Sequence, residues 1–169
     1  MRFWCSILVI ALLAGCGRDV EHSDGVRVGL VFDIGGRGDK SFNDAAYAGL
    51  ERAQKELGVT FTTLETNEGS DREAQMRQLA AGDAKLVFGV GFLFTDDIKA
   101  LATEFPNVKF ACVDYTVKEG EAMPSNLLAL KFKEEEGSYL VGALSALLSK
   151  TGTVGFVGGM EIPLIKKFE

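Results

Sequence analysis

The loop 33–43 holds the side chains of this chain that are best suited to bind a small polar molecule. It combines several glycines with Asp39, Ser41, Phe42 and Asn43. A phosphate-binding loop requires glycine directly before Lys-Ser, but Asp39 stands there, and its carboxylate would repel a phosphate. The dinucleotide-binding pattern fails as well, because no glycine follows at the required spacing. The loop therefore favours an uncharged or cationic hydrogen-bonding ligand, with Phe42 either stacking on it or packing in the core.

Two later loops carry groups of the same kind. Gly91 and Phe92 follow the apolar run 86–90, and Asp114 follows another apolar run, where it either contacts a ligand or stabilises the turn. Only one of Phe92 and Phe94 is expected to face a cleft, and the other to pack in the core. Carboxylates and amides bind the edges of heterocycles or sugar hydroxyls, and a base stacked on an aromatic ring gains about 1 to 3 kcal/mol. These groups suit a nucleoside, and equally a sugar or another small polar molecule.

Apolar runs and helical patterns alternate along the chain, and they decide where these loops lie. Apolar residues recur at helical spacing in 42–57 and in 139–147, and the pairs Ser41–Asp44 and Ser70–Glu73 fit capping boxes at helix starts. Such alternation predicts an α/β fold with a doubly wound parallel sheet, whose ligands gather at the carboxyl ends of the strands. The predicted strands are 28–32, 60–64, 86–90, 108–113, 127–130 and 153–157.

The first residues of the chain read as a bacterial lipoprotein signal. One arginine precedes the uncharged stretch 3–14, and small residues at Ala14 and Gly15 stand before Cys16. The stretch is shorter than the roughly 20 residues of a spanning helix. We expect residues 1–15 to be removed, Cys16 to be lipidated, and 16–25 to tether an extracytoplasmic domain to the periplasmic side or outer surface of the cell membrane. An ordinary secretory signal with an unrelated Cys16 is the alternative.

Composition narrows the possible functions. The net charge of −6 offers no basic surface for nucleic acid. With Cys5 in the signal and Cys16 lipidated, Cys112 has no partner for a disulfide, and its apolar surroundings predict a buried structural thiol. The one histidine, His22, lies in the tether, so we expect no metal, no cofactor and no enzyme.

Other functional classes stay open beside a solute receptor. A hydrolase acting on a nucleoside or glycoside with Asp39 and Asp114 is conceivable. A lipoprotein that presents this fold to a partner protein is another possibility.

Three segments, 29–43, 139–142 and 155–160, resemble the basic membrane protein family, the PnrA-like purine-nucleoside-binding lipoproteins of ABC importers. The segment Asp-Lys-Ser-Phe-Asn at 39–43 is the most specific of the matching motifs. The resemblance implies a periplasmic-binding-protein type I fold, in which two lobes close on a purine nucleoside, and ABC permease subunits as partners. The ligand-binding residues that it implies are Asp39, Lys40, Ser41, Phe42, Asn43, Gly91, Phe92 and Asp114 in the first lobe, and Gly159 and Met160 in the second.

The resemblance also implies a division of the chain into lobes. On this pattern the first lobe comprises 26–150, and 151–169 begins the second lobe, with a strand at 153–157 and a helix over 162–169. Members of the family are longer than this chain. We therefore expect the sequence to be a piece of a longer protein, or a truncated gene product that lacks most of its second lobe.

Overall fold

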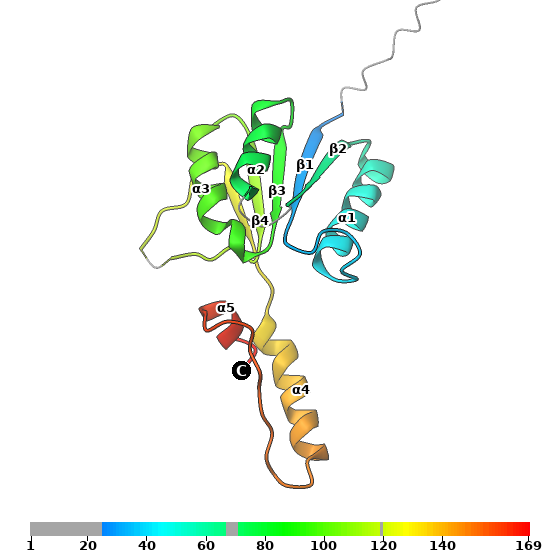
Figure 1. Ribbon diagram of the computed structural model, residues 1–169, viewed down its shortest axis with the longest axis vertical. Helices are drawn as coiled ribbons and strands as arrows, with labels where there is room; N and C mark the ends of the chain where they lie inside the picture. Colours follow the sequence, from blue (N-terminus) through cyan, green and yellow to red (C-terminus); the bar gives the residue numbers. More distant parts are fainter. Residues whose placement is uncertain (1–24, 67–70, 119) are drawn as a thin grey trace, which may run out of the picture.

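A computed structural model describes residues 25–66, 71–118 and 120–169 of the protein (Figure 1). The predicted signal 1–15, Cys16, the tether up to residue 24, and Ser70 lie outside the described residues. In the described part of the chain, no helix has both the length and the apolar character needed to cross a membrane.

Five parallel strands form one sheet in the order β2-β1-β3-β4-β5. The chain begins at β1, moves outward to β2 and then returns to β3 on the other side of β1, which is the strand order of a doubly wound fold. The predicted α/β sheet is thereby confirmed. The strands are β1 (Arg27–Phe32), β2 (Thr60–Glu65), β3 (Leu86–Val90), β4 (Lys109–Val113) and β5 (Leu127–Leu130).

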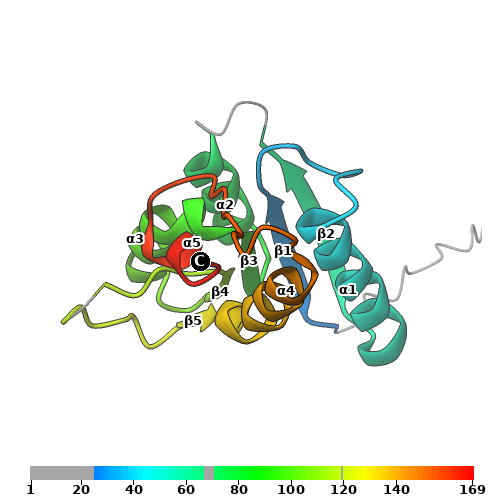
Figure 2. The ribbon, with the colours of Figure 1, turned by 90° about the horizontal axis from the view of Figure 1, so that it is seen from below.

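Helices cover both faces of the sheet. Helix α1 (Phe42–Leu57) lies on one face, and α2 (Arg72–Ala81) and α3 (Thr95–Glu104) lie on the other (Figure 2). In β1, Leu30 belongs to the core under α1, whereas the next residue, Val31, belongs to the core under α2 and α3. Because alternate side chains of a strand face opposite sides, a strand covered on both sides has no polar positions.

Glycine allows two close approaches in this core. A Cβ atom on Gly29 would lie 2.8 Å from Leu79 Cδ1, and one on Gly89 would lie 2.9 Å from Phe94 Cγ. The ring of Phe94 is fully buried. The prediction that one ring of the 92–94 pair packs in the core is therefore confirmed.

Cys112 is a structural thiol, as predicted. Its side chain is fully buried in the core beneath α2 and α3. Burial, reinforced by the nearby charges of Asp114 and Asp33, raises the pKa of the Cys112 thiol to about 12. The thiolate needed for nucleophilic chemistry is therefore scarce at neutral pH.

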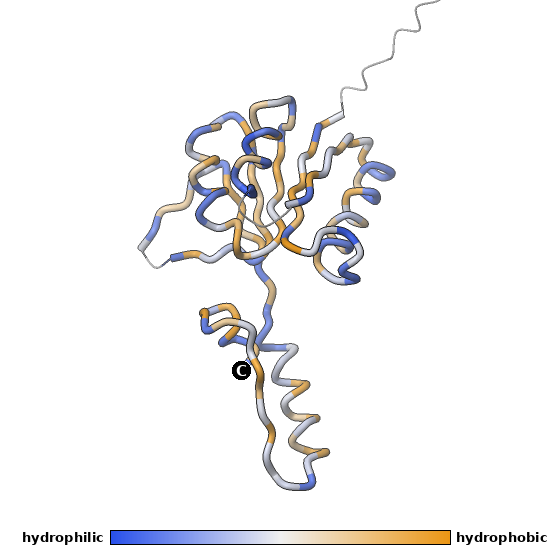
Figure 3. Tube along the Cα trace, viewed as in Figure 1, coloured by the Kyte–Doolittle hydropathy of each residue, from blue (hydrophilic) through white to orange (hydrophobic). Residues whose placement is uncertain are grey.

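After β5 the chain leaves the sheet. Helix α4 (Glu134–Leu148) and the short α5 (Pro163–Lys166) lie beyond the carboxyl ends of the strands (Figure 1). Hydrophobic residues recur along α4 (Figure 3). The side chains of Tyr139, Leu144 and Leu147 on this helix are exposed. The predicted helical pattern at 139–147 is confirmed by α4, but helical spacing defines a stripe without defining the surface that covers it. The domain boundary at residue 150 stays a prediction.

The prediction of a strand at 153–157 is wrong. This segment runs in an extended loop beside α4, and the structure pairs it with no strand among the described residues (Figure 1). An apolar, β-branched composition favours a strand, but a strand forms only where a neighbour accepts its backbone hydrogen bonds. Of the predicted helix 162–169, only α5 is present.

Candidate functional site

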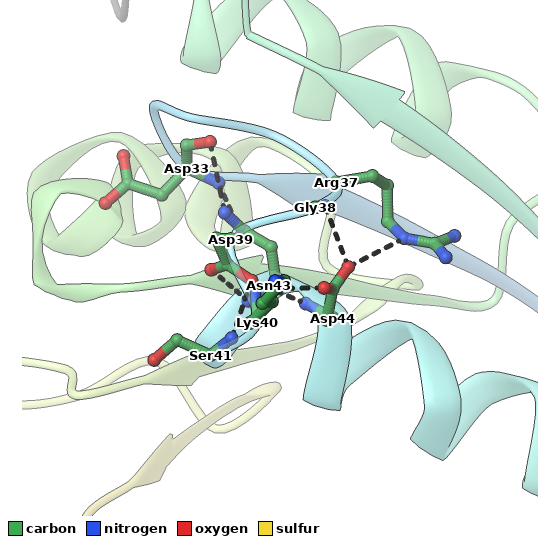
Figure 4. Close-up of polar contacts among 8 residues, drawn as sticks. All are labelled: Asp33, Arg37, Gly38, Asp39, Lys40, Ser41, Asn43 and Asp44. Atoms are coloured by element: carbon green, nitrogen blue, oxygen red, sulfur yellow. Dashed lines mark hydrogen bonds and ion pairs between the residues drawn. The ribbon is translucent and has the colours of Figure 1, made fainter.

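The hydrogen bonds of two carboxylates, Asp39 and Asp44, fix the conformation of the loop that precedes α1 (Figure 4). Asp39 accepts hydrogen bonds from the backbone N–H groups of Ser41, Asn43 and Asp44 at 2.9 to 3.1 Å. Asp44 in turn accepts hydrogen bonds from two backbone N–H groups of the loop and from the Arg37 side chain. The predicted capping box of Ser41 with Asp44 is not formed. The backbone N–H groups that would donate to a Ser41 cap already donate to Asp39. Asp39 is thus the residue that caps α1.

Asn43 ties the start of α1 to the end of β1. Its side chain is buried, with Oδ1 accepting the backbone N–H of Asp33 at 3.1 Å and Nδ2 donating to the Asp33 carbonyl at 3.5 Å. Lys40 is exposed and adopts a left-handed backbone with φ of 53°. These contacts hold the loop in shape, and the ligand-binding roles of Asp39, Lys40 and Asn43 stay predictions.

Replacing Asp39 with alanine is expected to lower the Tm by about 2 to 4 °C at neutral pH, because the start of α1 loses its cap. The Asn43 amide, followed by those of Ser41 and Asp44, lowers the pKa of Asp39. A lowered pKa gives stabilisation that is present above the ordinary carboxyl pKa and is lost as the pH falls through the lowered value. The Tm difference should therefore shrink in strong acid.

Thermal melts at neutral and acid pH measure this effect. Glu51→Ala, on the exposed surface of the same helix, is the matched control. An Asp39→Ala protein with an unchanged Tm and a weakened affinity for ligand would instead show that Asp39 binds the ligand.

A cavity of about 910 Å³ opens between the carboxyl edge of the sheet and α4. Its wall on the sheet side includes Phe42 and Asp114, and the crossing segment between β5 and α4 adds Phe132 and the start of α4 adds Glu134. The carboxyl edge of a doubly wound sheet is where ligands bind in this fold class. The cavity is therefore the candidate binding site.

Asp114 lines this cavity and carries a buried carboxylate oxygen without a partner. Its residue is 9% exposed, its backbone is left-handed with φ of 58°, and its Oδ1 has no hydrogen-bond partner among the described residues. Burial, and secondarily the charge of Glu134, raises the pKa of Asp114, while Lys131 acts in the opposite direction. Unpaired buried carboxylates with a shifted pKa are typical of functional sites.

Glu134, in the first turn of α4, presents a second unsatisfied acceptor. Its side chain is buried, its Oε2 lies 3.3 Å from Lys167 Nζ, and its Oε1 has no partner among the described residues. Together with Asp114 it places two carboxyl groups in the polar part of the cavity wall. A ligand that offers N–H or O–H donors matches this surface.

Two phenylalanine rings form the apolar part of the site. Phe42 is 48% exposed and Phe132 is 55% exposed, and their centroids lie 6.2 Å apart with an edge-to-face angle of 74°. Both rings line the large cavity and also a smaller groove of about 340 Å³ beside it. The structure thus leaves Phe42 at the surface of the site and not in the core.

The structure gathers only part of the predicted site. Gly91 has φ of 112° and Phe92 is half-buried in the single turn Phe92–Phe94, both outside the two cavities. Gly159 and Met160 lie in an exposed bend, also outside them. Of the predicted residues, Ser41, Phe42 and Asp114 line at least one of these two cavities, and neither cavity is lined by Asp39, Lys40, Asn43, Gly91, Phe92, Gly159 or Met160.

Sequence analysis missed Phe132 and Glu134. The rule that directs attention to the loops after strands applies equally to β5, which ends at Leu130 just before Phe132. The burial of Glu134 and the unpartnered state of its Oε1 have no such signal, because an acidic residue in the first turn of a helix is expected there for its interaction with the helix dipole alone.

The arrangement is suited to binding. A paired-acid hydrolase would need Asp39 and Asp114 to face one cavity, but Asp39 does not line the cavity of Asp114, and its oxygens already accept backbone hydrogen bonds. Within the described ranges, no three side chains of His, Cys, Asp or Glu gather as metal ligands. Unpaired acceptors beside flat rings hold a ligand without supplying a nucleophile and its base.

Comparisons with known proteins agree with a binding role. A family model described as ABC transporter substrate-binding protein, PnrA-like, matches residues 26–169. An uncharacterized lipoprotein of Pyrococcus furiosus is 36% identical over 168 residues, which cover 96% of this chain and 42% of that protein. The ABC transporter nucleoside-binding protein BmpA of Lactococcus lactis is 32% identical over 170 residues, which cover 95% of this chain and 47% of that protein.

Solved structures of similar fold come from the same class of protein. The crystal structure of an ABC transporter system solute-binding protein from Aeropyrum pernix matches with a TM-score of 0.71 and 33% identity, over 85% of this chain and 40% of that one. The chain thus spans less than half the length of these relatives, and its sheet has the fold of a periplasmic-binding-protein lobe. The family resemblance of the sequence is confirmed, and the protein belongs to the Bmp family of PnrA-like ABC transporter substrate-binding proteins.

Proposed function

We propose that the protein is the substrate-binding lipoprotein of an ABC importer and that its ligand is a purine nucleoside. Membership of the family supports the receptor role, and the name of the Lactococcus lactis relative, a nucleoside-binding protein, supports the ligand. The observation that carries the proposal is the buried, unpartnered Oδ1 of Asp114 in a cavity that two exposed phenylalanine rings also line.

A nucleoside satisfies both parts of this site. Its base stacks on an aromatic ring, a contact worth about 1 to 3 kcal/mol, and its N–H or O–H groups donate to Asp114 and Glu134. A free sugar lacks the flat apolar surface that matches Phe42 and Phe132. A nucleotide carries phosphate charge toward two carboxylates, which repel it.

Mass spectrometry of small molecules that copurify with the protein tests the ligand class, and calorimetry with inosine, guanosine, ribose and guanosine monophosphate gives the order of affinities. We expect the two nucleosides to bind more tightly than ribose or the nucleotide. Tighter binding of ribose would favour a sugar receptor. Release of free base from inosine during the titration would favour a hydrolase.

We further propose that the protein is lipidated at Cys16 after removal of 1–15, and that it delivers its ligand to ABC permease subunits. The name of the Pyrococcus furiosus relative, a lipoprotein, supports this anchor. The ligand would be enclosed when a second lobe, beginning with 151–169, closes over the carboxyl edge of the sheet. The cavity between that edge and α4 supports this arrangement, because residues from both sides line it.

Replacing Cys16 with alanine is expected to abolish lipidation, since the acylated thiol is lost. Metabolic labelling with a radioactive fatty acid in a bacterial host measures it. Cys112→Ala is the control and should keep the label, because burial prevents acylation of that thiol. Label retained on the Cys16→Ala protein would contradict the proposed anchor.

A further inference from the structure

A second, smaller groove adjoins the candidate site. It has a volume of about 340 Å³, at the lower end of the roughly 300 to 1,000 Å³ found for small-molecule pockets. Apart from Ser41, all of its lining side chains are hydrocarbon. They are Phe42, Ala45 and Ala46 of α1, Val90 and Val113 at the ends of β3 and β4, and Phe132.

The groove and the larger cavity differ in chemistry but share a border. Phe42 and Phe132 line both, whereas Asp114 and Glu134 line the larger cavity alone. A ligand that lies across the two rings therefore meets hydrocarbon on one side and unsatisfied acceptors on the other. A molecule with a flat, weakly polar ring joined to a hydroxyl-rich part has this same division.

We propose that the groove holds the purine ring of the ligand and that Ala45 sets the size of ring that it admits. This inference rests on the proposed nucleoside ligand. The sugar then lies in the larger cavity, whose wall includes the carboxyl groups of Asp114 and Glu134 as acceptors for its hydroxyls. The hydroxyl of Ser41 is the polar side-chain group in the groove that can reach a ring edge.

Ala45 is the position at which ring size can be tested without disturbing the core. Its residue is exposed, whereas Ala46 packs against the core beneath α1. An isobutyl group at position 45 therefore projects into the groove and leaves the core intact. Ala48 is exposed on the same helix and does not line the groove, so the same change there is a matched control.

The experiment compares Ala45→Leu and Ala48→Leu by calorimetry with inosine and with uridine, whose single ring is smaller. The leucine side chain occupies space that the purine ring needs, so Ala45→Leu should weaken inosine binding about 10- to 100-fold and uridine binding less. Ala48→Leu should leave both affinities unchanged. Ala45→Met, with a flexible side chain and good helix propensity, repeats the test if the leucine variant does not fold.

The outcomes of this experiment distinguish a failure of the inference about Ala45 from a failure of the proposed function. If Ala45→Leu binds inosine as tightly as Ala48→Leu, the ring lies elsewhere and the inference is overturned, while the proposed function stands. If both nucleosides lose affinity by one factor, Ala45 does not set ring size, and the inference is again overturned. If the unaltered protein binds neither nucleoside, the proposed function fails and the inference fails with it.

Discussion

Replacing Asp114 with asparagine is expected to weaken the binding of inosine about 10- to 100-fold and to make the unliganded protein more stable. A hydrogen bond to a charged group contributes about 1.5 to 3 kcal/mol, and each 1.4 kcal/mol is a factor of ten in affinity. Asparagine has nearly the same shape and tolerates the left-handed backbone at φ of 58°. The variant therefore removes charge with little change in geometry.

The gain in stability follows from the pKa of Asp114, which burial and the charge of Glu134 raise. With a raised pKa in the folded state, the acid contributes stability that is fully present below the unfolded pKa and is lost as the pH rises through the folded value. At neutral pH the carboxylate is therefore a destabilising group. Replacing it with a neutral amide should therefore raise the free energy of unfolding at neutral pH, because an uncharged group loses less hydration on burial.

Calorimetry with inosine and urea denaturation at several pH values measure both effects. The stability difference between the Asp114→Asn protein and the unaltered one should disappear in acid, where Asp114 is protonated in both states. Glu51→Gln, an exposed carboxylate on α1, is the control and should change neither quantity. An unchanged affinity would remove Asp114 from the binding site, and a loss of stability would show that the carboxylate is satisfied in the native state.

Replacing Asn126 with alanine is expected to lower the free energy of unfolding by about 3 kcal/mol. The amide Nδ2 of Asn126 donates to the carbonyls of Ala102, Phe105 and Val108 at 2.8 to 3.2 Å, and its residue is 7% exposed. The backbone carbonyl of Asn126, which the variant keeps, accepts the backbone N–H of Phe110. This side chain joins the end of α3 to the starts of β4 and β5, and its loss leaves buried carbonyls unpaired at about 1 to 3 kcal/mol each.

Urea denaturation measures the effect, with Asn107→Ala as control, since that asparagine is exposed in the neighbouring turn. Asn126→Asp keeps the shape but replaces the donor with a negative charge, so it should destabilise the protein at least as much at neutral pH. A loss from Asn126→Ala no larger than that from Asn107→Ala would contradict the structural role. Because β5 leads into Phe132 and Glu134, such a loss should also disturb the candidate site.

Local patterns in the sequence determined the architecture of the sheet. Apolar runs predicted β1 to β5, and several of them lack polar alternation because a strand covered by helices on both faces has no position for a polar side chain. Gly58 follows the helical pattern 42–57 directly and ends α1 in the left-handed conformation with φ of 68°, which glycine favours. The burial of Cys112 followed from its apolar neighbours. Each of these features depends on residues close together in the chain, so the sequence alone was enough.

The membership of the site depended on the tertiary structure. Sequence reasoning placed Asp39 and Asn43 at the ligand, but the fold brings backbone amides and the end of β1 to their side chains. It did not find Phe132 and Glu134, which enter the cavity only because the chain turns away from the sheet after β5. Which side chains share a cavity depends on where distant segments cross, and side-chain periodicity carries no information about that crossing.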